Sequence, residues 1–111
     1  MSDIEFAIND TGSYTLIFHD EDGLVDVSAF TGGTIKFTEV DTPSTAVASA
    51  ALSSIGTPVT TEAVFTIPTS GFAVGDDEYH DYLAQVELTG SGTRSTFVYT
   101  ARVTKKLGTS T

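Results

Sequence analysis

The sequence predicts an all-β protein, and three observations support this fold class. Apolar residues alternate with polar residues in several short runs, as they do in strands with one buried face. The chain contains 19 threonines, which suit a pleated surface, and 10 glycines, which suit turns. Strong helix formers are sparse outside residues 46–52. At 111 residues without a long linker, we expect a single domain over 1–111.

The first half of the chain contains three clear alternating runs. Each run places every second apolar residue on the face that we expect to be buried: Ile4, Phe6 and Ile8; Tyr14, Leu16 and Phe18; Ile35 and Phe37. Ile17 and Lys36 fall on the opposite faces. Polar turns follow the first two runs at 9–12 and 19–23, and a further short run covers 24–27.

The second half contains three more runs and one ambiguous segment. The expected inward residues are Val59, Ala63, Phe65 and Ile67; Tyr82, Ala84, Val86 and Leu88; Phe97, Tyr99, Ala101 and Val103. Pro68 ends the first run, and residues 89–92 suit a hairpin loop. Residues 45–54 permit one turn of helix, but we predict an irregular or weak strand. The core should span 4–104, with 105–111 as a frayed tail.

The charge and composition narrow the classes of partner. Fifteen acidic and five basic residues give a net charge of −10, which opposes nucleic-acid binding. The cations, scattered along the chain without forming a basic stripe, are Lys36, Arg94, Arg102, Lys105 and Lys106. We expect no membrane partner, because no apolar run approaches about 18 residues. Neither do we expect a secretory signal, because the N-terminus lacks a basic and an apolar region. The chain has no cysteine for disulfides or thiolate chemistry.

The order of the turn and strand motifs resembles one family. These motifs are D-T-G at 10–12, D-E-D-G at 20–23, V-D-V-S at 25–28, G-T-I-K-F at 33–37 and Y-L-A-Q-V-E-L at 82–88. Together they resemble the immunoglobulin-like β-sandwich of tailed-virus virion proteins, especially the N-terminal domain of phage baseplate upper proteins. The resemblance covers roughly residues 4–104 and implies an immunoglobulin-like antiparallel β-sandwich of seven to eight strands.

The resemblance also implies a function. We expect a non-enzymatic structural protein of the virion, with the major capsid protein, tail proteins or further copies of itself as partners. Family members often continue into receptor-binding regions, whereas this chain ends at Thr111. We therefore favour a capsid accessory or decoration protein over the alternative, a tail or baseplate component. A second departure is the acidic insertion that separates Gly75 from Tyr82.

That acidic insertion is the candidate metal site. Asp76, Asp77, Glu78 and Asp81 cluster before the late strand. Successive residues of a strand point to opposite faces, so these carboxylates would converge on calcium only in a tight loop. We predict a solvated strand entry with no cofactor. The alternative is a calcium loop in a calcium-dependent adhesion or carbohydrate-binding module.

Other polar groups give weaker indications. Residues 19–23 (HDEDG) fail the register of an EF-hand loop and suit a hairpin turn instead. A zinc or acid–base site would require His19 and His80 to meet at one end of the sandwich. No catalytic motif is present, so we expect no enzyme activity.

Three aromatic residues stand outside the alternating runs. Phe30, Phe72 and Tyr79 fall in expected loops beside glycine or aspartate. Aromatic side chains contribute disproportionately to interface energy, so these three are the candidate partner-binding residues. The alternative is local packing within the loops.

Overall fold

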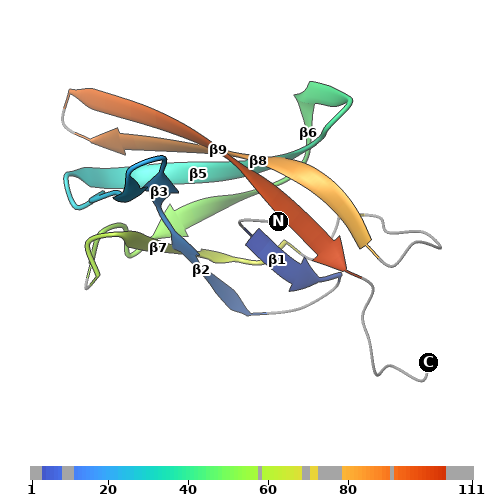
Figure 1. Cartoon of the computed structure of the whole chain (residues 1–111), viewed down its shortest axis with the longest axis horizontal. Helices are drawn as coiled ribbons and strands as arrows, with labels where there is room; N and C mark the ends of the chain where they lie inside the picture. The colour runs from blue at the N-terminus through green and yellow to red at the C-terminus, as the bar shows by residue number, and fades with distance from the viewer. Residues whose placement is uncertain are drawn as a thin grey trace.

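The all-β prediction is confirmed by the computed structural model, which describes residues 4–8, 12–57, 59–68, 71–72, 79–90 and 92–104 (Figure 1). The strands of this part of the chain are β1 (Ile4–Ala7), β2 (Ser13–Ile17), β3 (His19–Asp20), β4 (Gly23–Leu24), β5 (Phe30–Glu39), β6 (Thr42–Ser53), β7 (Glu62–Thr66), β8 (Tyr79–Gly90) and β9 (Thr93–Thr104). These residues include no helix long and apolar enough to cross a membrane. Residues 9–11 and the expected tail at 105–111 lie outside the described residues.

Seven strands form one sheet that folds back on itself, in the order β1-β9-β8-β5-β6-β7-β2. Strand β6 connects the two layers, because it begins beside β5 and pairs with β7 only through Leu52 and Ser53. The two edge strands, β1 and β2, approach each other, since the backbone N–H of Glu5 on β1 donates to the hydroxyl of Tyr14 on β2 at 3.3 Å. The sheet is nearly closed.

The expectation of a wholly antiparallel sheet was wrong at one pair. Strand β1 runs parallel to β9, with Ile4 opposite Ala101 and Ala7 opposite Thr104. The other strand pairs are antiparallel, including the separate hairpin of β3 and β4. Strands β1 and β2 are consecutive in the chain, yet they lie at opposite ends of the strand order.

The core lies between the two layers and contains the predicted inward faces. Fully or almost fully buried side chains include Ile4, Leu16, Phe18, Ile35, Phe37, Phe65, Tyr82, Val86, Leu88 and Val103. Phe37 is central, with ring centroids 6.0 Å from Phe6, 5.9 Å from Phe65 and 5.1 Å from Phe72. The pairs with Phe6 and Phe72 meet edge to face, a favourable arrangement for aromatic rings.

One prediction within the strands is confirmed and one needed correction. Residues 45–53 fall within β6, so the irregular strand predicted for 45–54 is present in place of a helical turn, and its pairing with β5 shows register shifts on either side of Thr38. Val59 is 45% exposed, so the buried face of the next strand begins at Ala63. The hairpin reading of 19–23 is confirmed: the Asp22 N–H donates to Asp20 Oδ1 at 2.8 Å in the turn between β3 and β4.

Candidate interaction surfaces

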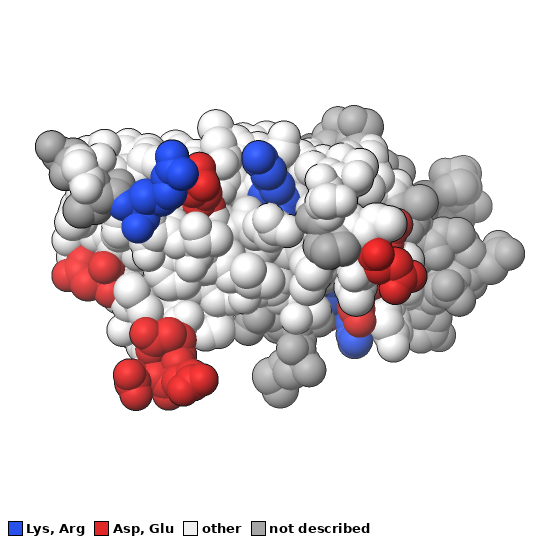
Figure 2. Space-filling view, turned by 90° about the horizontal axis from the view of Figure 1, so that it is seen from above, with Lys and Arg blue, Asp and Glu red and all other residues white. Residues whose placement is uncertain are grey.

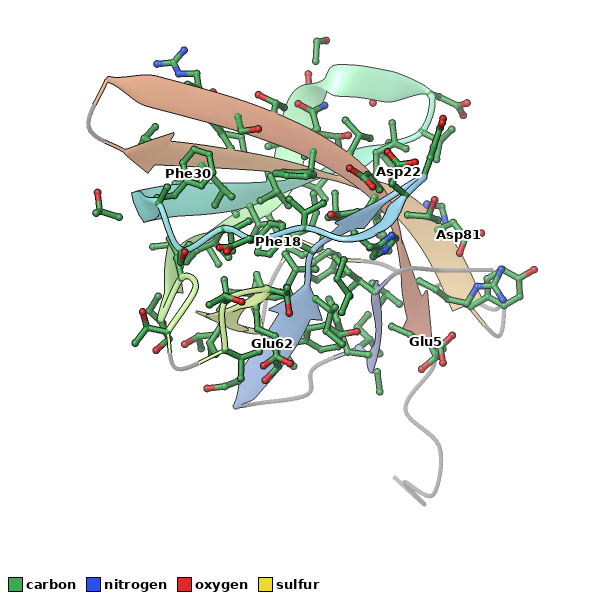
Figure 3. The ribbon with its side chains drawn as sticks, turned by 60° about the vertical axis from the view of Figure 1, so that its left-hand side comes forward. Glu5, Phe18, Asp22, Phe30, Glu62 and Asp81 are labelled. Atoms are coloured by element: carbon green, nitrogen blue, oxygen red, sulfur yellow. The ribbon has the colours of Figure 1, made fainter. Side chains whose placement is uncertain are left out.

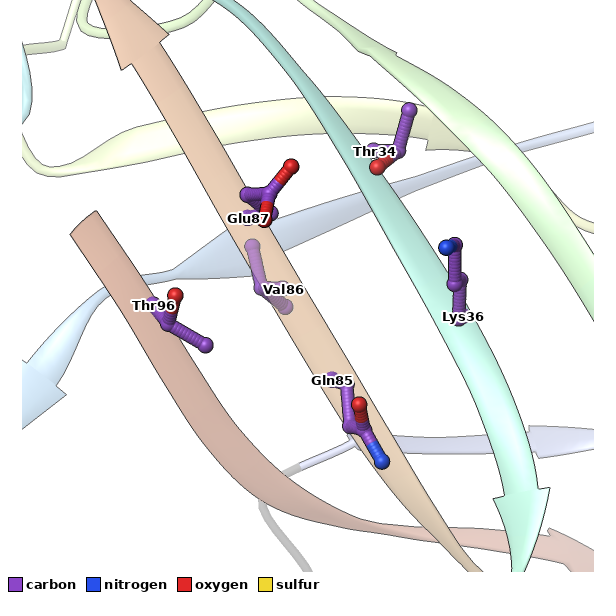
Figure 4. A pocket seen from close by; sticks show the side chains of 6 residues that line it. All are labelled: Thr34, Lys36, Gln85, Val86, Glu87 and Thr96. Carbon is purple, nitrogen blue, oxygen red and sulfur yellow. The ribbon is translucent and has the colours of Figure 1, made fainter. Parts of the chain in front are cut away.

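The outer face of the layer formed by β5, β8 and β9 contains a shallow hollow. Its volume is about 70 Å³, and its lining residues are Thr34, Lys36, Gln85, Val86, Glu87 and Thr96 (Figure 4). Strand alternation places Lys36 on this side, because its neighbours on β5, Ile35 and Phe37, point into the core. Small-molecule sites usually enclose several hundred Å³. This hollow is therefore much smaller than a typical small-molecule site.

The same outer face gathers the basic residues that the structure describes. Lys36, Arg94 and Arg102 are distant in sequence, yet strand parity places all three on this side of the sheet. The Arg94 guanidinium lies 4.0 Å from the Glu87 carboxylate, with both side chains well exposed. In Figure 2 the blue groups are separated from the largest red cluster, which projects from one edge of the molecule. Lys105 and Lys106 lie outside the described residues.

Asp81, Arg102 and Tyr79 form a second polar group at the far end of this face. Asp81 on β8 lies directly opposite Arg102 on β9. Arg102 donates from Nε to Asp81 Oδ1 at 2.9 Å and from Nη2 to Oδ2 at 3.3 Å. The guanidinium also lies 3.8 Å from the centre of the Tyr79 ring. The hydrogen bonds from Arg102 lower the pKa of Asp81 below its usual value and raise the pKa of Arg102.

The two histidines do not meet in one site. His80 Nε2 lies 2.6 Å from Glu39 Oε1, and its ring contacts Tyr82. The His19 backbone contacts the Tyr99 hydroxyl at 3.1 Å, and their rings lie 4.9 Å apart. Tyr99 pairs with Ala84, which is four residues along β8 from His80. Four residues of strand span about 13 Å, so the structure does not bring the histidines together for a shared zinc or acid–base role.

The calcium candidates are only partly described. Asp76, Asp77 and Glu78 lie outside the described residues, whereas Asp81 lies within β8. Both carboxylate oxygens of Asp81 accept hydrogen bonds from Arg102, so this carboxylate already has a cationic partner. Among the residues that the structure describes, no group of three or more histidine, cysteine, aspartate or glutamate side chains is arranged to hold a metal ion.

The three aromatic candidates occupy different environments. Phe72 packs inward, with ring centroids 5.5 Å from Phe6 and 5.2 Å from Tyr82. Phe30 is partly buried against the core at the start of β5. Tyr79 is 45% exposed, beneath Arg102. Figure 3 shows Phe30 and Asp81 at opposite ends of the molecule, and Tyr79 begins the strand that contains Asp81. Of the three candidates, Tyr79 presents the most accessible ring to a partner.

A further surface, the open edge of β9, is absent from the sequence-based predictions. Strand β9 pairs with β8 along its whole length, from Thr93 to Thr104. Its other side pairs with β1 only from Ala101 onward. The alternation of residues 96–103 predicts a strand and its buried face, but it contains no information about which strand lies beside it.

No protein-family model, curated protein or solved structure matches this chain. The function proposed below therefore depends on the strand arrangement, the exposed surfaces and the motif resemblance.

Proposed function

We propose that this chain is a non-enzymatic structural protein of a tailed virus particle with an immunoglobulin-like sandwich. In this proposal it is an accessory or decoration protein of the capsid, which docks onto other virion proteins through its loops and strand edges. Its chemistry is binding, with the major capsid protein as the principal partner.

The observation that carries the proposal is the order of strand pairing. Immunoglobulin-like domains pair strands B and E in one layer and strands C, F and G in the other. Here β2 pairs with β7 in one layer, and β5, β8 and β9 pair in the other, in the corresponding chain order. Strand β6 lies between the layers, where the connection from C to E belongs. This arrangement supports the fold on which the virion resemblance depends.

Two side chains add support at the positions where immunoglobulin-like domains place large core residues. Such domains bury an aromatic residue on strand C and a tyrosine near the start of strand F. Phe37 on β5 is fully buried, and Tyr82 near the start of β8 is 1% exposed. Both residues belong to the motifs that resemble the virion family.

The test is the protein composition of the particle. We expect mass spectrometry of purified, nuclease-treated virions from the virus that encodes this chain to detect it. We also expect it in DNA-free capsids separated from their tails. Purified virions that lack the chain would contradict the proposal.

Copy number distinguishes the two positions within a particle. A decoration protein should occur in a number of copies proportional to that of the major capsid protein. A tail or baseplate component should occur in only the few copies that form one ring. Quantitative mass spectrometry against labelled peptides of both proteins measures this ratio. If each particle contains only the few copies of one ring, and the chain is found only in isolated tails, the tail alternative would replace the capsid assignment.

A further inference from the structure

The open edge of β9 is a place where another strand can pair. Between Thr93 and Val98, β9 pairs with β8 on one side, and within the described residues no strand pairs with its other side. In an antiparallel ladder, alternate residues direct their N–H and C=O groups away from the partner strand. About half of the backbone polar groups in this segment therefore face the open edge, where they form a template for a further strand.

The side chains of this segment do not protect the edge. Natural edge strands usually carry inward-pointing charges, lysines, proline or a bulge that prevents pairing with another chain. Residues 93–98 read TRSTFV, with Arg94 as the single charged residue and with no proline. The described ladder between β8 and β9 runs without a register shift. Val98 is 60% exposed, and threonine, phenylalanine and valine all favour strands.

We propose that the partner of this edge is a second copy of the chain, paired antiparallel through β9. An antiparallel edge is complementary to itself, because a two-fold axis brings the same strand against its own copy. Charge favours this site for self-association: the whole chain carries −10, whereas 93–98 contains one cation and no carboxylate. Two acidic copies therefore meet here without bringing carboxylates of this segment together.

Pairing at this edge joins the larger layers of the two copies into one continuous sheet. Each copy contributes β1, β9, β8, β5 and β6 to that sheet. Side chains that alternate outward on β9, including Thr96 and Val98, pack across the new strand pair. Phe97 already contacts Phe18 inside its own copy, so pairing adds backbone hydrogen bonds without repacking this part of the core.

The experiment compares two valine-to-lysine substitutions in the purified chain. Val98→Lys adds a second cation to the edge that already contains Arg94, so antiparallel pairing would bring like charges of the two copies together. The matched control, Val40→Lys, changes a valine of similar exposure (54%) in the turn between β5 and β6. Both substitutions lower the net negative charge equally, so a general charge effect would favour association in both.

Sedimentation velocity over a wide concentration range measures the result. We expect the wild-type chain and Val40→Lys to form dimers with similar dissociation constants. We expect Val98→Lys to raise the dissociation constant at least tenfold. Circular dichroism shows whether each variant is folded. A wild-type chain that stays monomeric at millimolar concentration, or equal dimerisation of the two variants, would overturn the inference.

A cysteine cross-link provides a second measurement that does not depend on weakening the dimer. The chain lacks cysteine, so single substitutions at Arg94, Thr96 and Val98 introduce the sole thiol in each variant. Mixtures of these variants should oxidise to covalent dimers much faster than Val40→Cys at the same concentration. Equal rates would contradict pairing through β9. The inference concerns the chain alone in solution, so its failure would leave the virion proposal intact, and absence from virions would leave the dimer intact.

Discussion

Arg102 contacts two neighbours on the outer face of the sheet. Its guanidinium donates to both oxygens of Asp81 and covers the ring of Tyr79. The planar guanidinium suits both contacts, because it matches a carboxylate in its plane and an aromatic ring across its face. The arrangement fixes the start of β8 against the end of β9.

The Asp81 contact predicts a pH-dependent contribution to stability. Because the folded-state pKa of Asp81 is lowered, the contribution is present above the unfolded value of 3.8 and is lost as pH falls through the folded value. We expect Asp81→Asn to lower the melting temperature by a few degrees at neutral pH, since exposed ion pairs stabilise only modestly. Near pH 2 the two melting temperatures should converge.

The matched control for this pair is Glu87→Gln. Glu87 and Arg94 are more exposed and 4.0 Å apart, so this substitution should change the melting temperature less at neutral pH. Thermal melts of both variants across pH, followed by circular dichroism, measure the difference. A deficit in Asp81→Asn that persists unchanged below pH 2 would show that the contact does not act through the ionised carboxylate.

A second prediction for single residues distinguishes aromatic side chains that pack in the core from those available to bind a partner. Phe72→Ala should lower the free energy of unfolding by about 2–4 kcal/mol, because the ring contacts Phe6, Phe37 and Tyr82 in the core. Tyr79→Ala should cost much less, because its ring is exposed. Urea unfolding of both variants measures the two values. Equal losses would mean that Tyr79 has a packing role as large as that of Phe72.

At the scale of strands, the sequence predicted which face of each strand is buried better than it predicted which strands lie side by side. The alternation around Phe37, Val86 and Tyr99 correctly predicted which side chains are buried, because burial follows from period two along one strand. Strand partners depend on contacts between distant segments, so the parallel pairing of β1 with β9 was not predicted. The helical alternative for 45–54 stayed open in the sequence for the same reason, since the alanines and serines of β6 form a strand through pairing with β5.

The candidate surfaces differ in the same way: features of a single strand could be predicted, whereas features that depend on the order of several strands could not. The exposed position of Lys36 was predicted from its own strand. That Arg94 and Arg102 share its face requires the order of β5, β8 and β9 in the sheet, which alternation does not contain. The open edge of β9 likewise depends on how far β1 extends along it. Surfaces that several strands form together could therefore be identified only from the structure.

Two glycines in turns between strands provide a matched prediction. Gly56 follows β6 with φ of +68°, and a Cβ there would lie 2.4 Å from the Cα of Ser28. Gly92, in the hairpin between β8 and β9, has φ of +75° but open space around a Cβ. Gly92→Ala should cost about 1–2 kcal/mol from the left-handed conformation alone. Gly56→Ala should cost clearly more, because the backbone must also shift. Equal costs in urea unfolding would contradict the close approach to Ser28.

For the whole molecule, the dominant feature is an excess of negative charge around a well-packed aromatic core. The three described cations share one face, and two of them already lie beside carboxylates. Acidic side chains are exposed elsewhere on the surface, including the turn at Asp20, Glu21 and Asp22. Self-repulsion of this kind destabilises a compact state, and salt screens it. We therefore expect the melting temperature at neutral pH to rise by several degrees between about 10 mM and 500 mM sodium chloride.

Calcium provides the ion-specific comparison for this salt effect. At matched ionic strength, calcium chloride should give the same melting temperature as sodium chloride with EDTA. The physical reason is that the Asp81 carboxylate, the described member of the candidate calcium site, is already neutralised by Arg102. A bound ion would stabilise the folded state in proportion to the logarithm of its concentration. A rise specific to calcium and reversed by EDTA would support the adhesion-module alternative, whereas no rise with sodium chloride would show that self-repulsion does not limit stability.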